Sequence, residues 1–125
     1  MNIALWIAAS VLALAMLGAG LMKLSRKPEQ LKAAGMGWVD HVPAGAPRII
    51  GLLEVLGAIG LIVPALTGIA PILVPLAASG LAILMIGAVI VHVRMKDSFG
   101  HTVPAIVLAL LAIFVAWGRF GAYAF

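Results

Sequence analysis

Four ionisable residues lie inside or at the ends of apolar stretches of the sequence: Lys23, Glu54, His92 and Arg94. Glu54 lies within the apolar run 49–66, where a carboxylate facing lipid would be energetically costly. We therefore expect Glu54 to face the interior of a helical bundle and to be paired, hydrated or protonated. Histidine exchanges protons near neutral pH, so Glu54 and His92 could hydrogen-bond or exchange protons with a small amphipathic molecule. Lys23 or Arg94 could hold negative charge on that molecule.

The same four residues also fit a purely structural role. Buried charges are usually paired, and an ionic clamp around Glu54 would tie helices together without any ligand. Residue type and spacing do not decide between a ligand site and a clamp, so both interpretations stay open.

Other site chemistries are disfavoured. The chain contains no cysteine, which excludes disulfides, thiolate nucleophiles, iron–sulfur clusters and Cys-ligated zinc within these 125 residues. His41, His92 and His101 have no recognisable metal-ligand spacing, and we expect no metal site. Bis-histidine haem is also disfavoured, because His92 and His101 are predicted to lie on the same side of the membrane. Asp40 and His41, beside Trp38, are interpreted as part of an interfacial anchor.

The elements that position these residues follow from the composition. Hydrophobic residues make up 65% of the chain and charged residues 10%, against roughly 45–50% and 25% in ordinary globular proteins. This excludes a soluble domain. Apolar runs at about 3–22, 49–66, 71–93 and 103–120 are each long enough to cross a bilayer. The predicted fold is an all-α, integral membrane four-helix bundle that forms a single transmembrane domain over residues 1–125.

The first apolar run and the loop after it carry more specific signals. No lysine or arginine precedes Lys23, so the run is interpreted as an uncleaved transmembrane helix and not as a signal peptide. In the loop, Pro28 followed by EQLKAA and then Gly35 predicts a short helix. Leu31 and Trp38 would let this segment lie at the membrane interface.

The distribution of basic residues predicts the orientation. Seven of the eight flank the first and third connections: Lys23, Arg26, Lys27, Lys32, Arg48, Arg94 and Lys96. By the positive-inside rule these connections face the cytoplasm, and both termini are periplasmic or extracellular, in a bacterial inner (plasma) membrane. This placement explains the net charge of +4 without a nucleic-acid partner. Arg119 and Tyr123 suit the opposite interface.

Small residues recur four positions apart in the first and fourth spans. The pairs are Ala4/Ala8, Ala9/Ala13, Ala15/Ala19, Ala105/Ala109 and Ala112/Ala116. This spacing favours close approach of helix backbones in a membrane. Besides the lipid bilayer, the expected partners are a membrane protein complex or further copies of the chain.

Several segments together resemble the DoxX-like family of small four-span membrane proteins. They are MKL at 22–24, IGLLEVLGAIGLIVP at 50–64, PLAASGLAILMIGA at 75–88 and HVR at 92–94. The resemblance covers nearly the whole chain. It implies four membrane helices, with Lys23, Glu54, His92 and Arg94 at matching positions.

The resemblance also suggests a range of functions. The chain resembles a subunit of a thiosulfate:quinone oxidoreductase, and other relatives are associated with redox stress complexes or with assembly of membrane proteins. Because cysteine is absent, direct thiol electron transfer is excluded, whereas quinone or lipid binding is not. The leading prediction is a quinone- or lipid-binding redox-accessory subunit, with no cofactor other than that ligand, and catalysis is left open. The alternative is a non-catalytic accessory or assembly subunit of a larger membrane complex.

Overall fold

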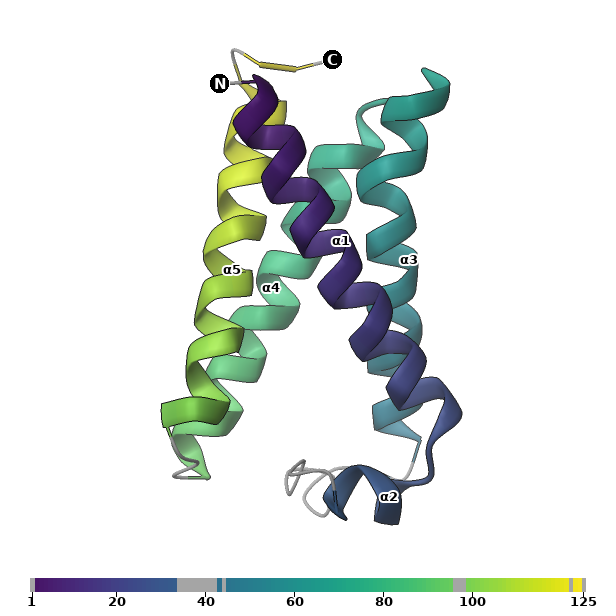
Figure 1. The fold of residues 1–125 in the computed structure, drawn as a ribbon, viewed down its shortest axis with the longest axis vertical. Helices are drawn as coiled ribbons and strands as arrows, with labels where there is room; N and C mark the ends of the chain where they lie inside the picture. Colours follow the sequence, from purple (N-terminus) through teal and green to yellow (C-terminus); the bar gives the residue numbers. More distant parts are fainter. Residues whose placement is uncertain (1, 34–42, 44, 96–98, 122, 125) are drawn as a thin grey trace.

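The computed structural model describes residues 2–33, 43, 45–95, 99–121 and 123–124. This part of the chain contains four long helices and one short helix: α1 (Asn2–Ser25), α2 (Pro28–Ala33), α3 (Ala46–Thr67), α4 (Leu73–Arg94) and α5 (Phe99–Phe120). Each of the four long helices is long and apolar enough to cross a membrane. The predicted all-α architecture with four membrane helices is confirmed (Figure 1).

Three of the long helices extend past the predicted spans at the end of the bundle that carries α2. α1 continues to Ser25, α3 begins at Ala46 and α5 begins at Phe99, each about a turn outside the apolar run. Apolar runs mark only the segment that prefers hydrocarbon, whereas helical hydrogen bonding continues into the polar flanks.

The connection between α3 and α4 is a tight turn without charged residues. Gly68 adopts a left-handed conformation with a φ of +70°, and its N–H donates to the Pro64 carbonyl at 3.0 Å. Glycine reaches this conformation without the steric strain that a Cβ would add. The turn therefore ends α3 and lets α4 run back beside it.

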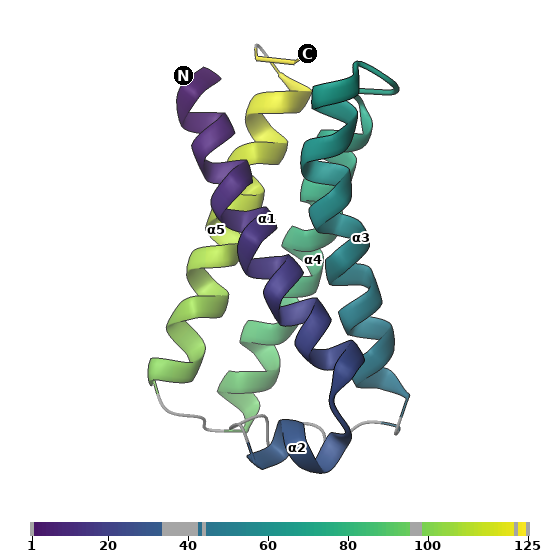
Figure 2. The ribbon, with the colours of Figure 1, turned by 45° about the vertical axis from the view of Figure 1, so that its right-hand side comes forward.

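The long helices form two closely packed pairs. α1 packs mainly on α3, and α4 packs mainly on α5, while α3–α4 and α1–α5 contacts join the pairs. The N- and C-termini lie together at one end of the bundle, and α2 lies across the other end (Figures 1 and 2). At the α2 end, the ribbons of α1 and α3 diverge from those of α4 and α5.

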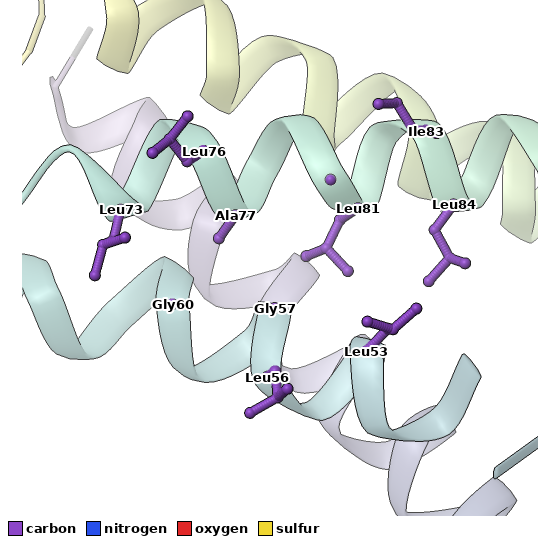
Figure 3. Close-up of a pocket in the computed structure, with 11 residues that line it drawn as sticks. Leu53, Leu56, Gly57, Gly60, Leu73, Leu76, Ala77, Leu81, Ile83 and Leu84 are labelled. Carbon is purple, nitrogen blue, oxygen red and sulfur yellow. The ribbon is translucent and has the colours of Figure 1, made fainter. Parts of the chain in front are cut away.

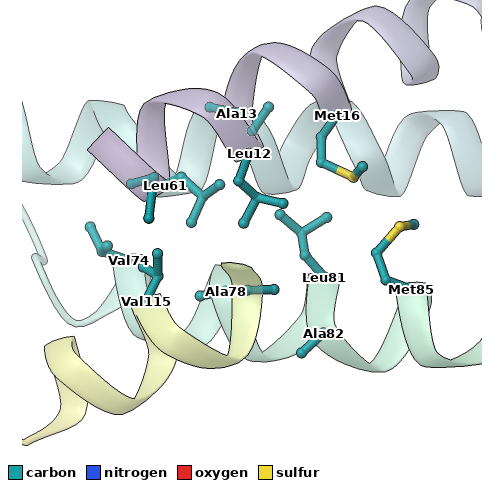
Figure 4. Close-up of a cluster of buried hydrophobic side chains, with 14 of the residues drawn as sticks. Leu12, Ala13, Met16, Leu61, Val74, Ala78, Leu81, Ala82, Met85 and Val115 are labelled. Atoms are coloured by element: carbon teal, nitrogen blue, oxygen red, sulfur yellow. The ribbon is translucent and has the colours of Figure 1, made fainter. Parts of the chain in front are cut away.

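The interior between the four helices is apolar and uses mostly small side chains (Figure 4). Leu12 of α1 lies beside Leu61 of α3, and farther along the bundle Met16 of α1 lies toward Leu81 and Met85 of α4. Of the alanines predicted to mediate packing, six are buried: Ala8, Ala9, Ala13, Ala105, Ala109 and Ala112. Large aliphatic side chains such as those of leucine and isoleucine cover the outer surface, as a lipid-facing bundle requires.

The predicted short helix is present as α2. The Gln30 side chain accepts a hydrogen bond from the Lys27 N–H at 2.9 Å, which satisfies a free donor at the start of the helix. Leu31 is completely buried, so its side chain packs against protein. The interfacial position of α2 stays a prediction, and Trp38 lies outside the described residues.

Candidate functional site

Lys23 and Glu54 form a buried ion pair between α1 and α3. The Lys23 Nζ donates to Glu54 Oε1 at 2.6 Å, and the two residues are 31 positions apart in the sequence. The Glu54 side chain has no exposed surface, and the Lys23 side chain keeps 10% of its surface exposed. A distance this short is typical of a charge-assisted hydrogen bond. Glu54 therefore faces the bundle interior, as its charge requires.

Two glycines bring the charged residues together. A Cβ on Gly20 would lie 2.6 Å from the Gly51 carbonyl oxygen, and a Cβ on Gly51 would lie 2.8 Å from the Gly20 carbonyl oxygen. The α1 and α3 backbones therefore cross in direct contact at Gly20 and Gly51. Each glycine lies three residues before a charged partner, which places Lys23 and Glu54 on the same faces as the crossing.

One oxygen of the Glu54 carboxylate has no hydrogen-bond partner among the described residues. Oε1 is bonded to Lys23, whereas the buried Oε2 has no hydrogen-bond partner within the described residues. Buried polar atoms are nearly always hydrogen-bonded, because leaving an acceptor unpaired away from water is costly. The Lys23–Glu54 pair is therefore chemically able to accept one more hydrogen bond at Oε2.

His92 and Arg94 lie in the last turn of α4, at the same end of the bundle as the pair. His92 is half-buried and Arg94 is exposed. Among the described residues, Lys23 is the one that hydrogen-bonds to Glu54, so the structure brings two of the four predicted site residues into contact. Whether His92 and Arg94 act at the same site stays a prediction. Asp40, His41 and the His101 side chain lie outside what the structure describes.

A second buried charge lies at the opposite end of the bundle. Arg119 is 3% exposed, donates to Asn2 Oδ1 at 2.6 Å and to the Tyr123 carbonyl at 2.8 Å, and lies over the Trp6 ring at 5.8 Å. It joins the start of α1 to the end of α5. Sequence reasoning placed Arg119 at a membrane interface and missed this burial, because no nearby motif links it to Asn2 or Trp6.

An apolar groove of about 540 Å³ runs along α3 and α4 (Figure 3). Its lining is aliphatic or small and includes Leu53, Gly57 and Gly60 of α3 and Ala77, Gly80 and Leu84 of α4. These side chains offer no hydrogen bond, so the groove suits hydrocarbon. It does not include Lys23 or Glu54.

The sequence was compared with protein-family models, with curated proteins and with solved structures. The comparisons with curated proteins and with solved structures found no match. The model of the DoxX-like family matches residues 7–115, a range that contains Lys23, Glu54, His92 and Arg94. With four membrane helices and this match over most of its length, the chain belongs to the DoxX-like family.

Proposed function

We propose that the chain binds a small amphipathic molecule, a quinone or another lipid-like ligand, at the Lys23–Glu54 pair. In this role it serves as a redox-accessory subunit in a bacterial inner membrane, with the pair in the cytoplasmic leaflet. Arg94 and His92 complete the site, the first as a positive charge and the second as a proton-exchange group.

The observation that carries the proposal is the free acceptor on Glu54. Oε2 is buried and lacks a hydrogen-bond partner within the described part of the chain, although Lys23 satisfies Oε1. A clamp that only joined α1 to α3 would leave this buried acceptor unpaired, which costs stability. Ionisable groups inside membrane segments are also candidate functional sites in general.

The proposed role is accessory because of the chemistry that the chain lacks. No cysteine is present to carry electrons as a thiol. A carboxylate, an ammonium and an imidazole can bind a ligand and move its protons, but they do not accept electrons. Electron transfer would therefore belong to another subunit.

A binding measurement on the protein in nanodiscs tests the proposal. We expect Glu54→Gln and Lys23→Met each to weaken binding of a short-chain quinol by about tenfold or more, roughly one lost charged hydrogen bond. His92→Ala should weaken it less. The matched controls are Glu29→Gln and Lys27→Met, whose side chains are exposed on α2 or beside it. Equal binding by the site variants and the controls would refute the proposal, provided that circular dichroism shows all variants helical.

The apolar groove supports a second candidate function, a non-catalytic accessory or assembly subunit. A groove lined by glycine, alanine and leucine is suited to packing against a transmembrane helix of another protein. This candidate predicts a co-purifying membrane protein and no bound ligand. Gly80→Leu, which fills the groove from α4, should release that partner.

A further inference from the structure

We infer that the Lys23–Glu54 site selects ligands by a hydroxyl group, so that it binds a quinol in preference to the corresponding quinone. The inference rests on the proposed function and names the ligand class that the site would take. The feature behind it is the difference between the two oxygens of the Glu54 carboxylate.

The two residues of the pair offer different hydrogen-bonding groups, an acceptor on Glu54 and donors on Lys23. An ionised carboxylate only accepts hydrogen bonds, and Glu54 Oε2 is the acceptor without a partner among the described residues. A lysine ammonium has three N–H donors, of which one is directed to Oε1 at 2.6 Å. The site therefore offers one vacant acceptor on Glu54, together with the remaining donors of Lys23.

A quinol and a quinone respond differently to this arrangement. A quinol hydroxyl can donate to Oε2, and its oxygen can also accept from Lys23. A quinone has only carbonyl acceptors, which can bond to Lys23 but leave Oε2 unpaired. Because an unpaired buried acceptor carries a penalty, the quinol is the better ligand.

Burial restricts the size of the donor. Glu54 has no exposed surface, and the exposed part of the pair belongs to Lys23. A ligand must therefore approach past the lysine and reach Oε2 with a small group. A hydroxyl is the smallest hydrogen-bond donor that a lipid-like molecule carries, whereas an ammonium would be repelled by Lys23.

Three probes on the unmodified protein test the inference. They are a fully substituted short-chain benzoquinol, its quinone and its dimethyl ether. Binding of each to the protein in nanodiscs is measured under anaerobic conditions, so that the quinol is not oxidised. The quinol should bind at least about tenfold more tightly than either of the others, because only it donates to Oε2. If all three bind equally, the donor preference is overturned and the proposed ligand site stands. If none binds, the proposed function itself fails.

Glu54→Gln provides a second, independent readout. Lys23 should donate to the amide oxygen of the new side chain, which leaves its NH₂ group as a donor at the former Oε2 position. The preference should then disappear, because the NH₂ group donates equally well to a quinol hydroxyl oxygen and to a quinone carbonyl. Glu29→Gln, on the exposed surface of α2, should keep the original order. An unchanged order in Glu54→Gln would overturn the inference. Should that variant not fold, the three-probe comparison still decides.

Discussion

The Lys23 ammonium and the Glu54 carboxylate are buried together between helices that are apolar enough to lie in a bilayer. Removing two charges from water is costly, and their mutual attraction often does no more than offset that cost. Well-packed apolar residues could join α1 to α3 at least as firmly. The pair is therefore weak evidence for a purely stabilising role.

The energetic coupling of the pair can be predicted. Lys23→Met leaves the Glu54 carboxylate buried without its partner, and we expect it to lower the free energy of unfolding by about 3–5 kcal/mol. The double variant Lys23→Met/Glu54→Gln removes both charges and should recover most of that loss. Thermal unfolding in detergent, followed by circular dichroism, measures both effects. A single variant as stable as the unmodified protein would show that the two charges are not coupled.

At the level of single residues, part of the site could be predicted from the sequence. A glutamate in an apolar run requires a partner, and the sequence limits the candidates to Lys23, His92 and Arg94. The structure pairs Glu54 with Lys23. The choice among the three depends on how the helices cross, which the distance along the chain does not reveal. For the same reason, the contacts of Arg119 with α1 were not predicted.

The site depends on one helix crossing. α1 and α3 touch backbone to backbone at Gly20 and Gly51, and the charged residues follow one turn later on each helix. The expected alanine pairs describe the general packing of the bundle, and many of these alanines are buried. They did not identify this crossing, because Gly20 and Gly51 are single glycines that have no small residue four positions away on the buried face.

Gly51→Ala tests the crossing. The added Cβ would lie 2.8 Å from both the Gly20 carbonyl oxygen and the Lys23 Cβ, so the helices must separate. We expect a loss of about 1–3 kcal/mol of stability from overpacking. Ligand binding should also weaken, because the separation moves Lys23 away from Glu54. Both effects are read from thermal unfolding and a binding titration.

Gly18→Ala is the matched control for this variant. Gly18 lies on α1, close to the crossing in sequence, and nothing lies within 4 Å of a Cβ added to it. It should leave ligand binding unchanged and the free energy of unfolding unchanged or slightly higher, because alanine favours a helix more than glycine does. If Gly51→Ala behaves like Gly18→Ala, the close crossing does not position the site.

Over the whole molecule, the exposed basic residues gather at one end of the bundle. The end that carries α2 also carries the exposed basic residues Arg26, Lys27, Lys32, Arg48 and Arg94, whereas the two termini lie at the other end. The number of membrane helices and their approximate positions along the chain could be predicted, because hydropathy acts over whole segments. The pairing of α1 with α3 and of α4 with α5 could not, since it depends on side-chain shape along each helix.

The orientation in the membrane stays a prediction that the absence of cysteine makes easy to test. Ser25→Cys and Ala124→Cys place single thiols on exposed residues at opposite ends of the bundle. A membrane-impermeant maleimide should label Ala124→Cys in cells with a permeabilised outer membrane, and Ser25→Cys only after lysis. The reverse pattern would place the basic end outside the cytoplasm and contradict the positive-inside prediction.

Native mass spectrometry from a mild detergent most directly tests whether the Lys23–Glu54 pair holds a lipid-like ligand in the membrane. The unmodified protein and Glu29→Gln should retain the same small molecule, detected as an added mass that collisional activation removes, and Glu54→Gln should lose it. Retention of that mass by Glu54→Gln at the level of the unmodified protein, or its absence from all three proteins, would contradict a ligand site at Glu54.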